Sequence, residues 1–307
     1  MPTTLDLEEA RVRWQQLGED PGLAPIARFH GRWLETLGGR PVATVALQLT
    51  PTDAERAVRA GEPLLLAGEV EVDVDELDGE VRLVAEALRD AGRGPASDVA
   101  RAVASAPVPF GELAGAALRG DEAAIEAGAF SLHLPLDPLR SLLQLAAQPV
   151  LWTVAEQAAT LVDLDRWQRG YCPVCGAWPL YGELVGPQRE RHLRCGRCGA
   201  GWVWAILLCP YCGNDDHRTL GTLGNPEDRE HRRVDVCERC TGYLKAIASY
   251  SRAPAPLLAA EDAATVHLDV AARERGYARP GLVPDPAVVG VPRTARAPDR
   301  SFDVAEG

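Results

Sequence analysis

Residues 172–176 read CPVCG, and similar pairs follow as CGRCG at 195–199, CPYCG at 209–213 and CERCT at 237–241. All eight cysteines of the 307-residue chain belong to these four Cys-x-x-Cys pairs. Two thiolates so close in sequence can bind one metal ion, and four thiolates complete a tetrahedral site. The stretch therefore predicts a metal-binding region rather than a disulfide framework.

The residues around the cysteines predict tight turns. Glycine directly follows the second cysteine in three pairs, at Gly176, Gly199 and Gly213. Glycine adopts the positive φ that such a turn requires, and Pro173 and Pro210 restrict the backbone inside two of the pairs. We therefore expect each pair to form a knuckle whose two thiolates point at one ion.

The pairs repeat as larger units. A gap of 19 residues separates the first pair from the second, a gap of 24 separates the third from the fourth, and an aromatic residue, Trp202 or Tyr243, follows each second pair. The repeat predicts two consecutive ribbons, over 166–204 and 205–253, with Val203–Leu208 as a strand joining them. The predicted ligands are Cys172, Cys175, Cys195 and Cys198 for the first ion and Cys209, Cys212, Cys237 and Cys240 for the second. An interleaved pairing, in which the first and third pairs share an ion, is the main alternative, and either zinc or iron suits such sites.

The sequence carries no pattern typical of an active site. Four thiolates leave no open position on the metal for hydrolytic chemistry, and the chain lacks a phosphate-binding loop, a nucleophile elbow and a His-Glu-x-x-His motif. His192 and His217 lie near cysteines, and we expect both to face solvent. We predict that the protein is not an enzyme, with no catalytic residues and no organic cofactor.

The charge distribution disfavours nucleic acid as a partner. The formal net charge is −12. Residues 166–253 contain thirteen Lys or Arg and nine Asp or Glu, and two four-thiolate sites of net charge −2 would cancel that excess. The chain has no apolar run of about 18 residues and no secretory signal pattern at its start, which predicts a cytoplasmic protein without membrane insertion.

The sequence before the cysteines has helical periodicity. Apolar residues recur at helical spacing across 1–165 without sustained strand-like alternation, which predicts an all-α domain. Thr50, Ser97 and Asp121 are expected to cap helices, and Pro149 to kink or split a long apolar helix. After the ribbons, 254–280 should contain one helix, from Glu261 to about Arg275, followed by an extended proline-rich tail over 281–307.

Four cysteine-containing segments and a C-terminal segment together resemble one family. The segments CPVCGAWP, LRCGRCGAGW, CPYCGN and CERCTGYLK, followed by EDAATVHLDVAARERGYARP, resemble the FdhE family of formate dehydrogenase accessory proteins. The resemblance implies a multi-domain α+β fold, with an all-α helical domain followed by two tandem rubredoxin-like or zinc-ribbon lobes. It also implies that the eight cysteines are metal ligands, and that the protein binds the catalytic subunit of formate dehydrogenase in the cytoplasm as a non-catalytic assembly factor.

Three functions are open at this point. In the first, a client subunit docks in a cleft between the helical half and the ribbons, whose relative orientation the metals fix. In the second, a thiolate-bound iron performs a redox step on the client. The third is a zinc-ribbon protein that binds nucleic acid, whose affinity would fall steeply with salt. The oligomeric state does not follow from the sequence.

Overall fold

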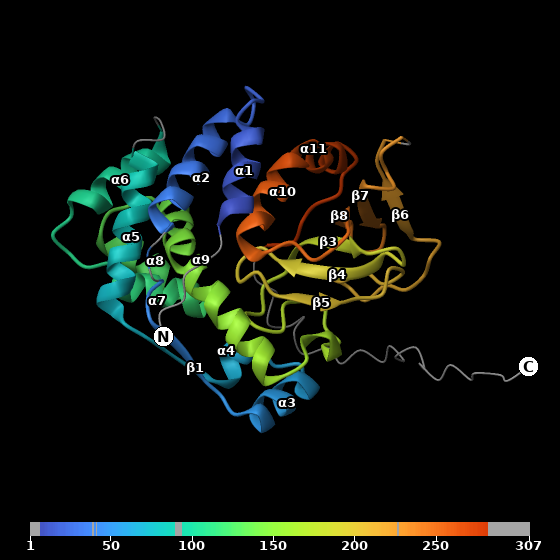
Figure 1. Ribbon diagram of the computed structural model, residues 1–307, viewed down its shortest axis with the longest axis horizontal. Helices are drawn as coiled ribbons and strands as arrows, with labels where there is room; N and C mark the ends of the chain where they lie inside the picture. The colour runs from blue at the N-terminus through green and yellow to red at the C-terminus, as the bar shows by residue number, and fades with distance from the viewer. Residues whose placement is uncertain (1–6, 39, 41, 90–93, 226, 282–307) are drawn as a thin grey trace, which may run out of the picture.

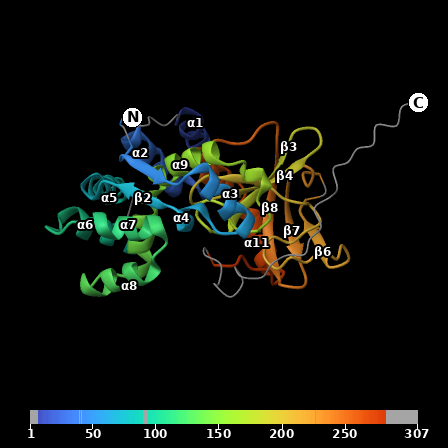
Figure 2. The same ribbon diagram turned by 90° about the horizontal axis from the view of Figure 1, so that it is seen from below.

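The helices of the first half surround one central helix and lie beside a C-terminal sheet (Figures 1 and 2). The computed structural model describes residues 7–38, 40, 42–89, 94–225 and 227–281. The helices of this half are α1 (Glu8–Leu17), α2 (Ala24–Leu37), α3 (Pro51–Ala60), α4 (Leu64–Ala67), α5 (Val74–Arg89), α6 (Pro95–Ser105), α7 (Gly111–Arg119), α8 (Glu122–Ser131) and α9 (Leu136–Leu161).

The central helix, α9, is apolar on most of its circumference and is buried accordingly. Helices α5, α6, α7 and α8 all contact it. Pro149 does not split α9, which continues to Leu161, and Pro149 is itself buried within the helix. Of the predicted kink or split at Pro149, the split is therefore absent. The carbonyl of Pro149 accepts a hydrogen bond from the Thr153 hydroxyl at 3.3 Å.

The predicted helix caps have different outcomes. Thr50 caps α3 by accepting from the N–H of Asp53, and Asp121 caps α8 by accepting from the N–H of Ala124. Both predictions are confirmed. The prediction for Ser97 is wrong, because α6 begins at Pro95 and the Ser97 hydroxyl donates to the carbonyl of Leu88 on the preceding helix.

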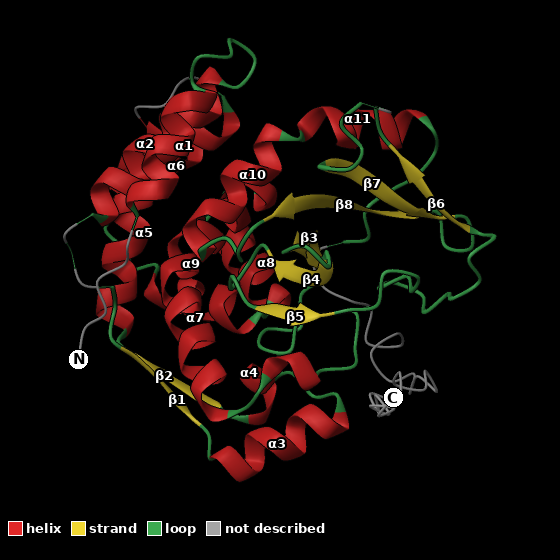
Figure 3. Cartoon of the chain, turned by 45° about the vertical axis from the view of Figure 1, so that its right-hand side comes forward, coloured by secondary structure: helices red, strands yellow, loops and turns green. Residues whose placement is uncertain are grey.

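The helical half also contains a small sheet that the periodicity does not predict. Strands β1 (Val45–Gln48) and β2 (Glu69–Val72) pair antiparallel and flank α3 and α4 in the chain (Figure 3). Four-residue strands are too short to give a clear alternation in sequence. The side chain of Gln157 on α9 bonds the N–H of Leu47 and the carbonyl of Val45, which fixes β1 to the central helix.

The two ribbons share one six-stranded sheet. Its order is β5-β4-β3-β8-β7-β6, so each ribbon supplies three neighbouring strands. The pairs within each ribbon are antiparallel, whereas β3 and β8 are parallel and join the two halves. The strands are β3 (Pro179–Val185), β4 (Glu190–Cys195), β5 (Gly201–Val203), β6 (Leu220–Leu223), β7 (Arg232–Cys237) and β8 (Gly242–Ser249).

The connection between the ribbons is not the predicted strand. Strand β5 ends at Val203, and residues 204–208 turn back instead of continuing. The indole N–H of Trp204 donates to the carbonyl of Leu208 at 2.9 Å, which closes this turn. The apolar residues of Val203–Leu208 therefore fold over the ribbon and do not extend its strand.

Two helices, not one, follow the sheet. Helices α10 (Leu258–Ala264) and α11 (Val266–Glu274) are separated at Thr265, whose φ of −114° and ψ of 20° interrupt the helix. Both lie alongside the sheet (Figure 1), where Leu268 and Ala272 pack against the second ribbon. Of the predicted tail over 281–307, only Gly281 lies within the described residues.

Candidate metal centres

The eight cysteines form two clusters of four. The first and second pairs meet in one cluster and the third and fourth pairs in the other, so the predicted adjacent pairing is confirmed and the interleaved alternative is wrong. Within each cluster, all four sulfur atoms lie within 4.8 Å of one another. The Sγ atoms of Cys172 and Cys198 are 3.4 Å apart, and those of Cys209 and Cys240 are 3.7 Å apart.

Each cluster is built from knuckles of the predicted kind. Gly176, Gly199 and Gly213 have φ values of 74°, 75° and 73°, and each donates its N–H to the carbonyl of the cysteine four residues earlier. In the fourth knuckle Thr241 takes the same left-handed conformation, with φ of 53°. The repeated backbone geometry brings two sulfur atoms of each knuckle to one side.

The arrangement of sulfur atoms fits a metal ion. A tetrahedral ion with metal–sulfur bonds of about 2.3 Å would hold its ligand atoms about 3.8 Å apart. Burial raises the pKa of Cys172 and Cys198, and contact with Cys240 together with burial raises that of Cys209. Burial also raises the pKa of Cys212, to about 11. Such thiols become thiolates at neutral pH when a cation binds them, which is the chemistry of zinc and iron sites.

Both knuckles of the first cluster are attached to the helical half. The N–H groups of Leu64 and Leu65, at the start of α4, donate to the carbonyls of Pro173 and Val174 at 2.8 and 2.9 Å. Arg197, between the cysteines of the second pair, donates to the carbonyl of Leu118 at the end of α7 at 2.9 Å, and also to that of Ala117. These contacts satisfy backbone groups at two helix ends that have no partner within their own helix.

The α9 helix reaches the same cluster. The side chain of Gln148 donates to the carbonyl of Gly196 at 2.8 Å, and Trp152 on the next turn lies against Gly199. Cys172, Cys195 and Cys198 are fully buried. The first cluster therefore lies inside the joint between the helices and the sheet.

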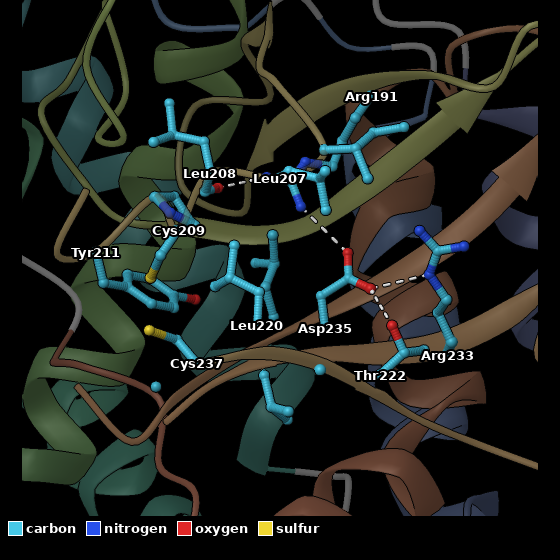
Figure 4. Close-up of a pocket in the computed structure, with 16 residues that line it drawn as sticks. Arg191, Leu207, Leu208, Cys209, Tyr211, Leu220, Thr222, Arg233, Asp235 and Cys237 are labelled. Atoms are coloured by element: carbon cyan, nitrogen blue, oxygen red, sulfur yellow. Dashed lines mark hydrogen bonds and ion pairs between the residues drawn. The ribbon is translucent and has the colours of Figure 1, made fainter. Parts of the chain in front are cut away.

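The second cluster lies at the other ribbon and has a more open side. Cys212 and Cys240 are partly exposed, whereas Cys209 and Cys237 are buried. A cavity of about 80 Å³ is lined by the two buried cysteines together with Tyr211 and Leu220 (Figure 4). The side-chain amide of Asn214 donates to the Cys237 sulfur at 3.5 Å, which supports the charged form of a ligating thiolate.

Buried arginines connect the ribbons to each other and to their turns. Arg191 on β4 pairs with Asp235 on β7 at 3.1 Å and also donates to the carbonyls of Ala205 and Leu208 (Figure 4). Arg194 pairs with the buried Glu183 at 2.6 Å. Sequence reasoning missed these pairs, because an arginine in a polar stretch gives no sign of whether it points into or out of a sheet.

A second polar network attaches α10 and α11 to the sheet. Lys245 on β8 is fully buried and binds Asp262 at 2.6 Å and Asp269 at 2.7 Å. Arg279 binds the same two carboxylates, and the hydroxyl of Tyr243 donates to Asp269 at 2.8 Å. The segments CERCTGYLK and EDAATVHLDVAARERGYARP, which carry the family resemblance, therefore meet in one structural contact.

The two histidines near the cysteines differ. His217 is exposed, as predicted. The prediction for His192 is wrong: its ring is 3% exposed, with Nε2 3.0 Å from Glu190 and Nδ1 3.8 Å from Asp165. His192 lies on β4 facing the segment before the first ribbon, and it is buried because β4 is covered on both faces from Arg191 to Cys195.

The family model for "FdhE, C-terminal domain" matches residues 207–284, which contain the second cluster and run to the end of α11 and beyond. A protein FdhE homolog of Aquifex aeolicus is 31% identical over 144 residues, 46% of this chain and 50% of that one. Protein FdhE of Escherichia coli O127:H6 is 30% identical over 119 residues, 38% of each chain. The C-terminal part of the chain is therefore similar to FdhE proteins.

The fold agrees with that of a solved FdhE structure. The crystal structure of the FdhE protein from Pseudomonas aeruginosa superposes with a TM-score of 0.59 over 91% of this chain and 95% of that chain, at 24% identity. The helical half and the sheet thus form a fold that also occurs in this solved structure. By sequence, the matched region spans half or less of the two relatives named above.

Among the described residues, no helix combines the length and the apolar composition that a membrane crossing requires.

Proposed function

We propose that this protein is an accessory factor for formate dehydrogenase, which acts in the cytoplasm by binding the catalytic subunit of that enzyme and catalyses no reaction itself. The similarity of the C-terminal part of the chain to FdhE proteins carries the proposal. The architecture supports it, because two knuckled clusters of cysteines and a helical body form a rigid binding surface. Four-thiolate sites have no open position for substrate.

We further propose that the eight clustered cysteines bind two metal ions, zinc or iron, one in each cluster. The sulfur geometry and the buried, raised-pKa thiols support metal binding. Metal analysis and an optical spectrum of protein purified without air would distinguish the ions. Two zinc ions per chain and a featureless visible spectrum would favour a structural role, whereas reversibly reducible iron would favour the redox alternative.

The candidate docking site for the catalytic subunit is a groove of about 300 Å³ between α9 and the two metal clusters. Leu145 of α9 lines one side, and Trp178 and Tyr211, with ring centroids 5.3 Å apart, line the other. Trp178 follows the first knuckle and Tyr211 lies inside the third. The groove therefore matches the cleft between helices and ribbons in which the sequence hypothesis places the client.

The docking site is tested with a charge placed in the groove. Leu145→Glu should abolish co-purification of the catalytic subunit and lower formate dehydrogenase activity in cells that lack their own accessory protein. Phe130→Glu is the matched control, because Phe130 is 84% exposed on α8 and lies outside the groove. Equal co-purification by both variants would exclude the groove as the docking site.

The metal dependence of the function is tested separately. Replacing Cys172 and Cys175 by Ala removes half of the first cluster, and we expect the formate dehydrogenase activity of the cells to fall. Circular dichroism of the purified variant reports whether the helical half still folds. Unchanged cellular activity would remove the first cluster from the mechanism.

A further inference from the structure

The two cysteine clusters are set in different surroundings. We propose that the first cluster joins the helical half to the sheet and does not readily exchange its metal ion. The second cluster is an exchangeable site, at which small thiols, metal chelators and soft electrophiles reach the ligands. This inference rests on the proposed metal occupancy of both clusters. It assigns different chemistry to two sites whose sequence motifs are nearly identical.

The first cluster is closed by elements far away in the sequence. Its first knuckle is hydrogen-bonded to the start of α4, and Arg197 of its second knuckle is bonded to the end of α7. On another side, a side-chain carbon added at Gly199 would lie 2.3 Å from Ala255, so the chain leaving the sheet is in close contact with the cluster. Cys175 is partly exposed, but the other three cysteines are fully buried, so a ligand reaches three of the four sulfur atoms only when this cover opens.

The knuckles of the second cluster contact chain segments at Gly170 and Ala278, but two of its four cysteines stay partly exposed. Glu238, Arg239 and Thr241, which flank the cysteines of the fourth pair, are all exposed. Cys212 and Cys240 are themselves partly exposed. The sulfur atoms of these two cysteines are thus within reach of solutes without movement of the helical half.

The sheet side of the second cluster is also hollow. The 80 Å³ cavity reaches Cys209 and Cys237, the two ligands that face away from solvent. Its lining includes Ile206 and Leu207, which are 47% and 60% exposed, so an exposed turn between the ribbons forms part of its wall. Ligand exchange at a four-thiolate site begins when an incoming group approaches a metal–sulfur bond, and here such approach needs local opening at most.

Arg197 and Arg239 provide a matched pair for the experiment. They occupy equivalent positions in CGRC and CERC, immediately before the last cysteine of each cluster. Arg197 donates to carbonyls at the end of α7, whereas Arg239 is exposed to solvent. Arg197→Ala therefore removes hydrogen bonds that hold α7 over the first cluster. Arg239→Ala makes the same chemical change at a side chain that faces solvent.

The test measures metal release from the purified full-length protein after its metal content has been determined. Excess 4-(2-pyridylazo)resorcinol should remove one ion per chain in a fast phase and the other at least about tenfold more slowly, because only the second requires separation of the helices. Arg197→Ala should accelerate the slow phase, and Arg239→Ala should leave both phases unchanged. Release of both ions at one rate would overturn the inference.

Alkylation identifies which cluster is fast. N-ethylmaleimide, quenched at intervals and followed by peptide mass spectrometry, should label Cys212 and Cys240 before Cys172 and Cys198. Early labelling of Cys172, Cys195 or Cys198, which are fully buried, would overturn the inference even if release is biphasic. A protein that binds no metal after reconstitution would overturn the metal proposal as well, whereas two bound ions released at equal rates would overturn only the difference between the sites.

Discussion

The buried histidine of α2 predicts a pH dependence of stability that can be assigned to one side chain. His30 is 8% exposed and stacks on Trp14, with ring centroids 4.2 Å apart and planes 2° from parallel. Phe29 and Trp33 also lie against the ring, and Nδ1 has no hydrogen-bond partner. Burial lowers the pKa of His30 from 6.5 to about 4, because the imidazolium would lose its hydration in this aromatic pocket.

The size of the effect follows from the two pKa values. A histidine whose folded pKa is depressed contributes stability above its unfolded pKa of about 6.5, and the folded state loses that contribution as pH falls toward about 4. At pH 5.5 the histidine is about 90% protonated in the unfolded state and stays neutral in the folded state. This difference lowers the free energy of unfolding by about 1.4 kcal/mol relative to pH 7.5. Below pH 4 the full loss reaches about 3 kcal/mol.

The assay is urea unfolding at pH 7.5, 6.5 and 5.5, followed by tryptophan fluorescence at constant ionic strength and metal content. His30→Phe keeps a ring against Trp14 but removes the titration, so its free energy of unfolding should fall about 1.4 kcal/mol less than that of the wild type across this range. The free energy of unfolding of His30→Gln should depend on pH as weakly as that of His30→Phe. This second variant separates the loss of titration from any overpacking by the larger phenyl ring. Identical pH slopes for wild type and both variants would refute the assignment.

Two further predictions concern buried contacts of the ribbons, and both are read from the same unfolding curves. Arg194→Met leaves the carboxylate of Glu183 buried without its partner and should lower the free energy of unfolding by about 3–5 kcal/mol, and a loss below about 1 kcal/mol would contradict a buried pair. In Gly170→Ala the new methyl carbon would lie 1.7 Å from the carbonyl oxygen of Pro210, so the variant should be clearly destabilised. Gly31→Ala, inside α2 with nothing within 4 Å of the new carbon, should instead stabilise the protein by about 0.5–1 kcal/mol. If both substitutions change the free energy of unfolding in the same direction, the close approach at Gly170 is not needed.

The cysteine clusters could be predicted from sequence because every requirement of a knuckle is local. The two cysteines, the glycine after them and the proline between them all lie within five residues, and the pairing followed from the duplicated spacing. The structure reproduces each of these features, down to the positive φ of Gly176 and Gly213. Thr241 adopts the left-handed conformation without glycine, so in that knuckle the cluster rather than the residue type sets the backbone.

What the sequence did not reveal depends on contacts between distant segments. The parallel pairing of β3 with β8 joins residues more than sixty positions apart, and no local pattern specifies which edges of two ribbons meet. Lys245, the one lysine of the chain, gave no sign that it would be fully buried, because its partners Asp262 and Asp269 belong to helices that follow. The Ser97 hydroxyl likewise bonds the carbonyl of Leu88 on the preceding helix, a contact that its own local sequence does not specify.

The first cluster lies at the joint between the helices and the sheet, so its metal ion should affect the docking groove. The ion would hold the CPVC and CGRC knuckles together, and these knuckles in turn bond the start of α4 and the end of α7. The groove between α9 and Trp178 is bounded by the same joint, because Gly196 and Arg197 line it. Loss of the first ion should therefore change the shape of the groove as well as the stability of the ribbon, whereas loss of the second ion should reach the groove through Tyr211 and through the segment that follows Ala278, which is bonded to Thr241. If client binding survives removal of the second ion but not of the first, the first cluster acts by orienting the two walls of the docking site.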